Sequence, residues 1–351
     1  MKKIEDLINN IIRISLAKKL KTGFTLGNTT KSYVGKYYTT PIRVTNKMAS
    51  VGVVVYSERE AQKILKKIDG KIDYILVDAE KKIPTKLSID GVTANIERLA
   101  RETIKKSELW IYKGNDLALE AIDMFLTHYT KNELRGLGNK KITIIGGGNL
   151  GSKLALRLVE RGAHVFLTRR NKGKLNKIVE AINLIKPINT KSKVWGSIDN
   201  AQAALKADIL IATNDGEKII NKKIIKNLKN KSILLDAGRG TILNEALVLA
   251  QKKGIKVYRV DINSAFEGLV STLFYLDDVL KNKSGRKTLN GAKIVSGGLL
   301  ARKNEFVVDN IFKPNFFYGV GDGHGDFIRN IQNNKMLQKR VKKFKEKLNL
   351  K

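Results

Sequence analysis

The chain has 351 residues, a length that suits two or three domains rather than one. It contains no cysteine, which excludes disulfides, thiolate metal sites, iron–sulfur clusters and a cysteine nucleophile. Its three histidines are too few for a histidine-rich metal site, so we expect no bound metal. No stretch resembles a membrane span, and acidic and amide residues interrupt the N-terminal segment where a signal peptide needs an apolar core. We therefore expect a cytoplasmic protein without membrane contact.

The net charge of +34 is typical of nucleic-acid-binding proteins, and it would also attract acidic metabolites. However, the basic residues are spread along the whole chain, and the high content of Lys, Ile and Asn also fits a compositional bias of the source genome. A small anionic metabolite is therefore the favoured partner, and nucleic acid is not. The most basic run, 335–351, has the apolar stripe of an amphipathic helix docked on the fold.

Residues 1–115 have the pattern of a small α/β domain on the substrate side. Ser57 and Glu60 form a capping box at the start of an expected helix over 57–68, and 91–107 has helical apolar spacing. Short apolar runs predict buried strands at 51–56, 74–77 and 109–112. Strands that alternate with helices indicate a mostly parallel sheet.

The next two segments, 116–140 and 141–263, are expected to be a connecting helix with its linker and a nucleotide-binding domain. The second has helix-patterned segments between six strand-like runs, at 142–145, 164–168, 193–195, 209–212, 233–236 and 257–261. Six strands joined by helical crossovers make a complete doubly wound (Rossmann) parallel sheet. Residues 264–351, with an expected helix at 266–280, a strand at 293–300 and a glycine-rich loop at 318–326, are expected to close the active-site cleft.

The prediction of a nucleotide-binding function rests on a glycine motif. An apolar strand runs directly into Gly146, Gly148 and Gly151, and a helix and a second strand follow. In this setting the first glycine makes the turn, the second lets the backbone approach a pyrophosphate, and the third lets helix and strand pack closely. The start of the helix, with Asn149 and Leu150, offers free N–H groups to the phosphates. The motif predicts dinucleotide binding.

The end of the second strand indicates which dinucleotide is bound. An NAD-specific site has an acidic residue there, but this chain has Thr168, Arg169 and Arg170. Arginine pairs with a 2′-phosphate through charge-assisted hydrogen bonds, whereas a carboxylate would repel it. NADP is therefore favoured over NAD.

Residues 146–174, with Arg169 ending the second strand, resemble the NADP-binding domain of shikimate dehydrogenases. Residues 212–216 (ATNDG) are similar to the turn that faces the nicotinamide in that family, which implies cofactor contacts for Thr213 and Asn214. Asn115 and Asp116 resemble the family's substrate loop, without its threonine and glycine. The family's serine-rich substrate motif is absent, which argues against shikimate as the substrate.

Residues 232–261 resemble a stretch of D-2-hydroxyacid dehydrogenases. The resemblance implies that Arg239 holds a substrate carboxylate, although the spacing from Arg239 to Ala246 is about one residue short. Gly238, in the same loop, is assigned to the cofactor. The two resemblances extend over little more than the expected nucleotide-binding domain.

Candidates for proton transfer lie in two loops. The glycine-rich loop contains Asp322, His324 and Asp326, and an Asp–His pair can act as a general acid–base unit. Alternatively, this loop is a surface turn or a weak cation site formed by the aspartates. Lys113 with Asp116 is the second candidate pair. The other two histidines, His128 and His164, are expected to be structural.

Taken together, the sequence predicts an NADP-dependent dehydrogenase or reductase, expected to be a homodimer. It would transfer a hydride to or from a small anionic ketone, alcohol, imine or amine. One alternative is an enzyme of hydrolase or lyase type that keeps NAD(P) bound and uses it transiently. Another is a non-enzymatic nucleotide sensor that binds nucleic acid.

Overall fold

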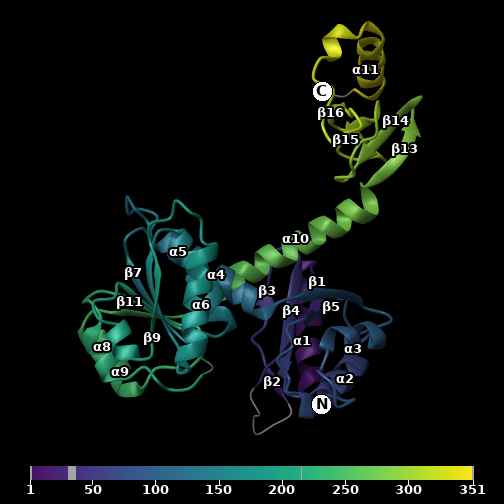
Figure 1. Ribbon diagram of the computed structural model, residues 1–351. Coiled ribbons are helices and arrows are strands. Elements are labelled where there is room, and N and C mark those ends of the chain that lie inside the picture. The colour runs from purple at the N-terminus through teal and green to yellow at the C-terminus, as the bar shows by residue number, and fades with distance from the viewer. Residues whose placement is uncertain (1, 31–36, 215, 350–351) are drawn as a thin grey trace. The chain divides into compact units, whose positions relative to one another are not determined.

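The computed structural model describes residues 2–30, 37–214 and 216–349. The chain divides into two compact units, one that ends at Gly268 and one that begins at Leu269. The first unit contains two separate six-stranded sheets, and the second contains a four-stranded sheet (Figure 1). The predicted α/β class is confirmed. In the described residues, no helix combines the length and the apolarity that a membrane crossing requires.

The first sheet has a parallel core with the strand order β4-β1-β5-β6, and two short strands, β2 and β3, pair antiparallel with β4. The strand bounds are β1 (Lys21–Asn28), β2 (Tyr37–Thr39), β3 (Arg43–Val44), β4 (Met48–Val55), β5 (Tyr74–Asp78) and β6 (Glu108–Tyr112). Strand β1 lies between β4 and β5 but was not predicted, because glycine and threonine alternate with its apolar residues. Phe24 and Leu26 nevertheless lie fully buried in the core.

The helices that build this core are α1 (Lys2–Lys18), α2 (Glu58–Ile68) and α3 (Ile96–Thr103), and a 3₁₀ turn, η1, spans Thr85–Leu87. Helix α2 begins as predicted, because the Ser57 hydroxyl accepts a hydrogen bond from the Glu60 N–H at 3.3 Å. Helix α3 is shorter than the predicted helix over 91–107. The side chain of Asn95 caps it by accepting from the Arg98 N–H, and the helix ends before Ile104.

The second sheet is entirely parallel, with the order β12-β11-β10-β7-β8-β9. Its strands are β7 (Lys141–Ile145), β8 (His164–Thr168), β9 (Val194–Ser197), β10 (Ile209–Ala212), β11 (Ile233–Asp236) and β12 (Lys256–Arg259). Counted from β7, this is the Rossmann order, in which the chain reverses direction across the sheet between β7 and β10. The predicted doubly wound sheet is therefore confirmed.

Helices cover both faces of this sheet, and each face has its own apolar core. One core includes α4 (Gly114–Tyr129), α5 (Asn149–Glu160) and α6 (Lys172–Ile185). The other includes α7 (Asn200–Ala203), α8 (Lys222–Asn227) and α9 (Asn244–Lys252). Helix α4, which connects the two sheets along the chain, is thus part of the Rossmann core, and its first residue is Gly114.

The second unit begins within α10 (Asn263–Asn282). Its sheet has the order β13-β14-β15-β16, and its remaining elements are β13 (Gly285–Leu289), β14 (Ala292–Ser296), β15 (Phe306–Val308), β16 (Phe317–Val320), η2 (Ile331–Asn333) and α11 (Lys335–Leu348). Phe306 and Phe344 are buried and meet edge to face in its core. The predicted loop at 318–326 is shorter than expected, because its first residues, Tyr318–Val320, belong to β16.

Candidate functional site

The glycine turn lies at the carboxyl end of β7. Gly146 has φ +113°, a conformation that L side chains rarely adopt. A Cβ atom at Gly151 would lie 2.0 Å from the carbonyl oxygen of Gly146, so no side chain fits there. A Cβ at Gly148, by contrast, would meet no atom within 4 Å. The turn is thus tightly packed at its first and third glycines and open at its second, where a ligand can approach the backbone.

Hydrogen bonds hold this turn against the two neighbouring strands. The Thr213 hydroxyl, after β10, donates to the Gly146 carbonyl at 2.7 Å. The Gly147 N–H donates to the carbonyl of Thr168, at the end of β8, also at 2.7 Å. Helix α5 starts directly after Gly148, and the first N–H groups of a helix have no intrahelical acceptor. The predicted residues Asn149, Leu150 and Gly151 therefore lie at a helix end whose N–H groups are available to an anion.

The two predicted arginines lie at the end of β8, beside this turn. The Arg169 guanidinium donates to the carbonyl of Gly147, and the side chain is half-buried. Arg170 is 95% exposed, with Glu217 at 4.0 Å. Thr168 is buried, and its backbone carbonyl, rather than its hydroxyl, contacts the turn. The structure thus brings one guanidinium onto the turn and leaves the other exposed to solvent.

The loops after β10 and β11 meet each other at Asn214 and Gly238. A Cβ atom at Gly238 would lie 1.8 Å from the Asn214 carbonyl oxygen, so this contact requires glycine. The Asn214 side-chain nitrogen donates to the Glu217 carbonyl at 2.7 Å. Its side-chain oxygen is buried and accepts no hydrogen bond within the described part of the chain. This unpaired acceptor lies one residue from Thr213, which holds the glycine turn.

Arg239 lies at the tip of the loop after β11, with an exposed side chain and φ +60°. The buried carboxylate of Asp236 fixes this loop. Its two oxygens accept from the Gly240 N–H at 2.7 Å and from the Thr241 hydroxyl at 3.0 Å. Asp236 therefore acts as a loop anchor that presents Arg239 at the carboxyl edge of the sheet.

A buried ionic cluster that we did not predict lies at the carboxyl end of β5. Asp78 accepts hydrogen bonds from the N–H groups of Glu80 and Gly114, both at 3.1 Å. The Lys82 ammonium lies 2.9 Å from Asp78 and 2.7 Å from Glu80. Burial by itself would lower the pKa of Lys82, but the two carboxylates outweigh it and raise the pKa above 10.5. Lys82 is therefore held as a cation.

The same cluster fixes the start of α4, where Lys113 is the N-cap residue and Asn115 and Asp116 belong to the first turn. Glu80 accepts from the Asn115 N–H at 3.1 Å, and the Asn115 side-chain nitrogen donates to the Asn149 side-chain oxygen at 3.2 Å. Asp116 lies 2.5 Å from the Lys153 ammonium of α5 and 3.8 Å from that of Lys113. The structure thus brings Asn115 to the glycine turn, whereas the closest basic partner of Asp116 is Lys153.

The remaining predicted residues, Asp322, His324 and Asp326, belong to the second unit. One oxygen of Asp322 accepts from the N–H groups of His324 at 2.7 Å and Asp326 at 3.1 Å. The backbone N–H of His324 thereby lowers the pKa of Asp322, although some desolvation opposes it. Asp326 pairs with Arg329 at 3.1 Å. His324 and Asp326 are exposed, and Asp322 is partly exposed. Across the described ranges, no group of three or more acidic or histidine side chains is arranged to hold a metal ion.

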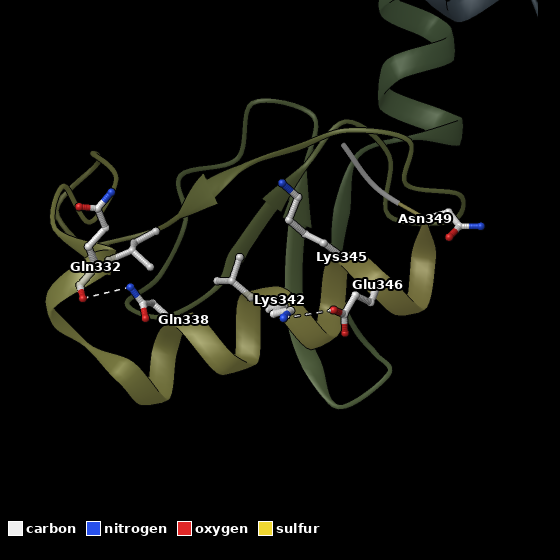
Figure 2. A pocket seen from close by; sticks show the side chains of 8 residues that line it. Gln332, Gln338, Lys342, Lys345, Glu346 and Asn349 are labelled. Atoms are coloured by element: carbon white, nitrogen blue, oxygen red, sulfur yellow. Dashed lines mark hydrogen bonds and ion pairs between the residues drawn. The ribbon is translucent and has the colours of Figure 1, made fainter.

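The second unit also has a groove between η2 and α11, which contains none of the predicted site residues (Figure 2). Gln338 donates across it to the Gln332 carbonyl at 3.0 Å, and Lys342 lies 3.9 Å from Glu346. Its apolar lining is formed by Ile331 and Val341. The polar side chains along this groove are lysine, glutamate and amide side chains, and we assign it no part in the candidate site.

Residues 141–240 match the protein family described as NADP oxidoreductase, coenzyme F420-dependent. The match begins at β7 and ends in the loop that holds Arg239, so it includes the glycine turn and the ends of β8, β10 and β11. It confirms the predicted nucleotide-binding Rossmann domain of oxidoreductase type. No curated protein matches the chain.

Several solved structures are similar to the chain at low identity. One chain of the dipicolinate synthase from Bacillus halodurans is 14% identical over 73% of this chain and 97% of its own, with a TM-score of 0.37. The L-tryptophan dehydrogenase from Nostoc punctiforme is 15% identical over 73% and 74%, with a TM-score of 0.43. The Thermus thermophilus glutamate dehydrogenase is 14% identical over 75% and 70%, with a TM-score of 0.44.

Proposed function

We propose that this protein is an NADP-dependent oxidoreductase that transfers a hydride to or from a small anionic metabolite. The observation that carries the proposal is the glycine turn, which is open at Gly148 and closed at Gly151, at the start of α5. A pyrophosphate needs both this open backbone and free helix N–H groups. The family match over 141–240 agrees with an oxidoreductase.

The preference for NADP rests on the end of β8. Arg169 lies on the glycine turn, and Arg170 follows it in solvent. Neither residue 169 nor residue 170 is acidic, so the strand end supplies two guanidinium groups for a 2′-phosphate instead of a carboxylate for a ribose hydroxyl. NADP would also place its nicotinamide near the loops after β10 and β11, where the unpaired oxygen of Asn214 offers an acceptor for an amide N–H.

The substrate is proposed to bind at the carboxyl edges of the two sheets, which α4 connects along the chain. Arg239 would hold its anionic group. For the proton that accompanies hydride transfer, we retain two candidates: His324 with Asp322 and Asp326, and Lys113 with Asp116. A cytoplasmic homodimer remains our proposal for location and assembly.

Binding of the two dinucleotides tests this function directly. We would titrate the protein with NADPH and with NADH by calorimetry, for wild type, Arg169→Ala and Arg59→Ala. Arg59 is an exposed arginine of α2 and controls for the loss of one charge. We expect NADPH to bind more tightly than NADH, and Arg169→Ala to weaken NADPH binding by about tenfold or more. Failure of the wild type to bind either dinucleotide would overturn the proposal.

A further inference from the structure

We propose that helix α10 forms the contact of a homodimer, in which it pairs in antiparallel orientation with α10 of a second copy of this chain. The inference rests on the proposed homodimer and deepens it, because it assigns the contact to one helix. Four leucines of α10 lie at steps of four, three and four residues along the chain: Leu269, Leu273, Leu276 and Leu280. Steps of three and four are the a and d spacing of a heptad, which lies on one narrow stripe of a helix.

The exposure of α10 increases along its length. Near its start, Phe266 is buried, and the Glu267 carboxylate accepts a hydrogen bond from the Asn46 N–H, in the turn between β3 and β4, at 3.1 Å. Towards its end, Leu276 is 46% exposed and Leu280 is 67% exposed. Exposed leucine side chains lose their contact with water when a second helix packs on the stripe, which favours association. The second half of α10 therefore offers an apolar surface to a partner helix.

The charge of α10 favours a second copy of this chain as that partner. Two copies with a net charge of +34 repel each other over most of their surface. Helix α10 has one lysine and three acidic residues, so its own net charge is −2 (1 − 3). The two acids beside the stripe are paired, Asp277 with Lys281 at 2.9 Å and Asp278 with Lys283 at 2.7 Å. Two copies can therefore meet along α10 without bringing uncompensated lysines together, whereas an acidic partner would be attracted to the basic surfaces elsewhere.

The stripe is self-complementary in the antiparallel orientation. A two-fold axis halfway between residues 274 and 275 places Leu269 of one copy opposite Leu280 of the other. The same axis places Leu273 opposite Leu276, so that every leucine of the stripe meets a leucine. An interface of two identical surfaces related by a two-fold axis requires this kind of match.

The acidic residues also favour the antiparallel orientation over the parallel one. In a parallel pair, Asp277 and Asp278 of the two copies would lie at the same level, and like charges that face each other across helices oppose pairing. In the antiparallel pair they lie at the level of Thr272 and Ser271, which are uncharged.

Introduced cysteines test this geometry without background, because the chain contains no cysteine of its own. We would prepare Leu269→Cys and Leu280→Cys and treat each alone, and an exchanged mixture of the two, with a short thiol cross-linker. In the antiparallel pair, the two copies of residue 280 lie 11 residues apart along the helix axis, about 16 Å at a rise of about 1.5 Å per residue. A cross-linker much shorter than this should therefore join the copies only in the mixture, as judged by denaturing electrophoresis.

A matched pair of double variants measures how much the stripe contributes. One carries Leu276→Asn with Leu280→Asn. The control carries Leu299→Asn with Leu300→Asn, at two leucines of the same unit that are 42% and 72% exposed. By sedimentation equilibrium, we expect the wild type and the control to be dimers and the α10 variant to dimerise at least about tenfold more weakly. Added salt should strengthen the wild-type dimer, because it screens the repulsion between two copies of charge +34.

Several results would overturn the helix pair. A monomeric wild type would mean that its own chain covers the stripe, and it would remove the homodimer as well. A dimer that the α10 double variant leaves intact would remove only the assignment to α10. Cross-linking of either cysteine variant with itself, or dimerisation that weakens with salt, would exclude the antiparallel apolar contact. NADPH affinity, measured for every variant, should stay at the wild-type value, so the cofactor proposal is tested separately. If the double variant does not fold, the single cysteine variants decide.

Discussion

The side-chain amide of Asn115, in the first turn of α4, donates to the side-chain oxygen of Asn149, in the first turn of α5, at 3.2 Å. Asn115 is also tied to the first sheet, through the hydrogen bond from its backbone N–H to Glu80. One residue therefore contacts both the carboxyl edge of the first sheet and the helix that begins at the glycine turn. This contact determines how the Asn149 side chain is oriented where we expect the pyrophosphate.

Replacing Asn115 with Ala should therefore weaken NADPH binding more than it affects folding. The lost hydrogen bond is exposed, so we expect a change in unfolding free energy below about 1 kcal/mol. We expect NADPH affinity to fall severalfold because Asn149 loses its orientation. A double-mutant cycle with Asn149→Ala, measured by calorimetry, checks this. Additive effects of the two changes would show that the contact has no role in binding.

Two of the motif glycines, Gly148 and Gly151, should respond differently to alanine. A methyl group at Gly148 meets no atom, so Gly148→Ala should fold with near-normal stability yet bind NADPH at least about tenfold more weakly, because the methyl group occupies the ligand's approach. At Gly151 the methyl would overlap the Gly146 carbonyl, and Gly151→Ala should lose about 1–3 kcal/mol of unfolding free energy. Urea denaturation and NADPH titration of both variants check these effects. Unchanged NADPH affinity in Gly148→Ala would contradict a pyrophosphate at this position.

Asp123 should be a strong stabilising contact between α4 and α5. Its side chain is 1% exposed and lies 2.5 Å from Arg161 and 3.2 Å from Arg157. Because the two arginines can still reach solvent, we expect Asp123→Ala to cost about 1–3 kcal/mol rather than the full penalty of a buried charge. Glu160→Ala, at an exposed position at the end of α5, is the control and should change stability by less than about 0.5 kcal/mol. Equal effects of the two changes would contradict this role of Asp123.

The cluster of Lys82, Asp78 and Glu80 predicts a particular dependence on alkaline pH. The pKa of Lys82 is raised above 10.5 in the folded protein, so its pairing contributes fully below pH 10.5 and is lost as pH rises through the folded pKa. Lys82→Met should cost about 3 kcal/mol near neutral pH, because it leaves the buried carboxylate of Asp78 without its cation. This difference from the wild type should shrink above pH 10.5. Urea denaturation at neutral and strongly alkaline pH measures it, and a difference that stays constant would exclude Lys82 as its source.

The Rossmann sheet was predictable because its four central strands, β11, β10, β7 and β8, are mainly apolar runs and its turn needs glycine at fixed spacing. The strands and helices of the first sheet, in residues 1–115, were predicted less completely. Strand β1 alternates small and polar residues with Phe24 and Leu26, so its apolar signal is weak, although it pairs with two neighbouring strands. Helix α1 was not predicted, although Ile4, Ile8 and Ile11 lie at helical spacing in the sequence and are buried on one face of the helix.

The site was predictable only where a motif is local. The residues of the glycine turn and the end of β8 lie together as neighbours on one sheet, as their order along the chain indicates. The sequence of Asp78, Glu80 and Lys82 has the pattern of an ordinary polar loop, and only the fold shows that these side chains meet the first turn of α4. Arg43 is one of many basic residues, and only the fold shows that its Nε atom is buried without an acceptor in the described ranges.

The carboxylates around α4 have a consequence for how this chain can evolve. The protein has 67 lysine and arginine residues and only 33 acidic ones, so its composition is strongly biased towards basic residues. Asp78, Glu80 and Asp123 cannot follow such a bias without loss, because each binds backbone N–H groups or basic side chains that a lysine cannot bind. In a set of diverging relatives, we expect these three acids to persist after most surface acids have been replaced.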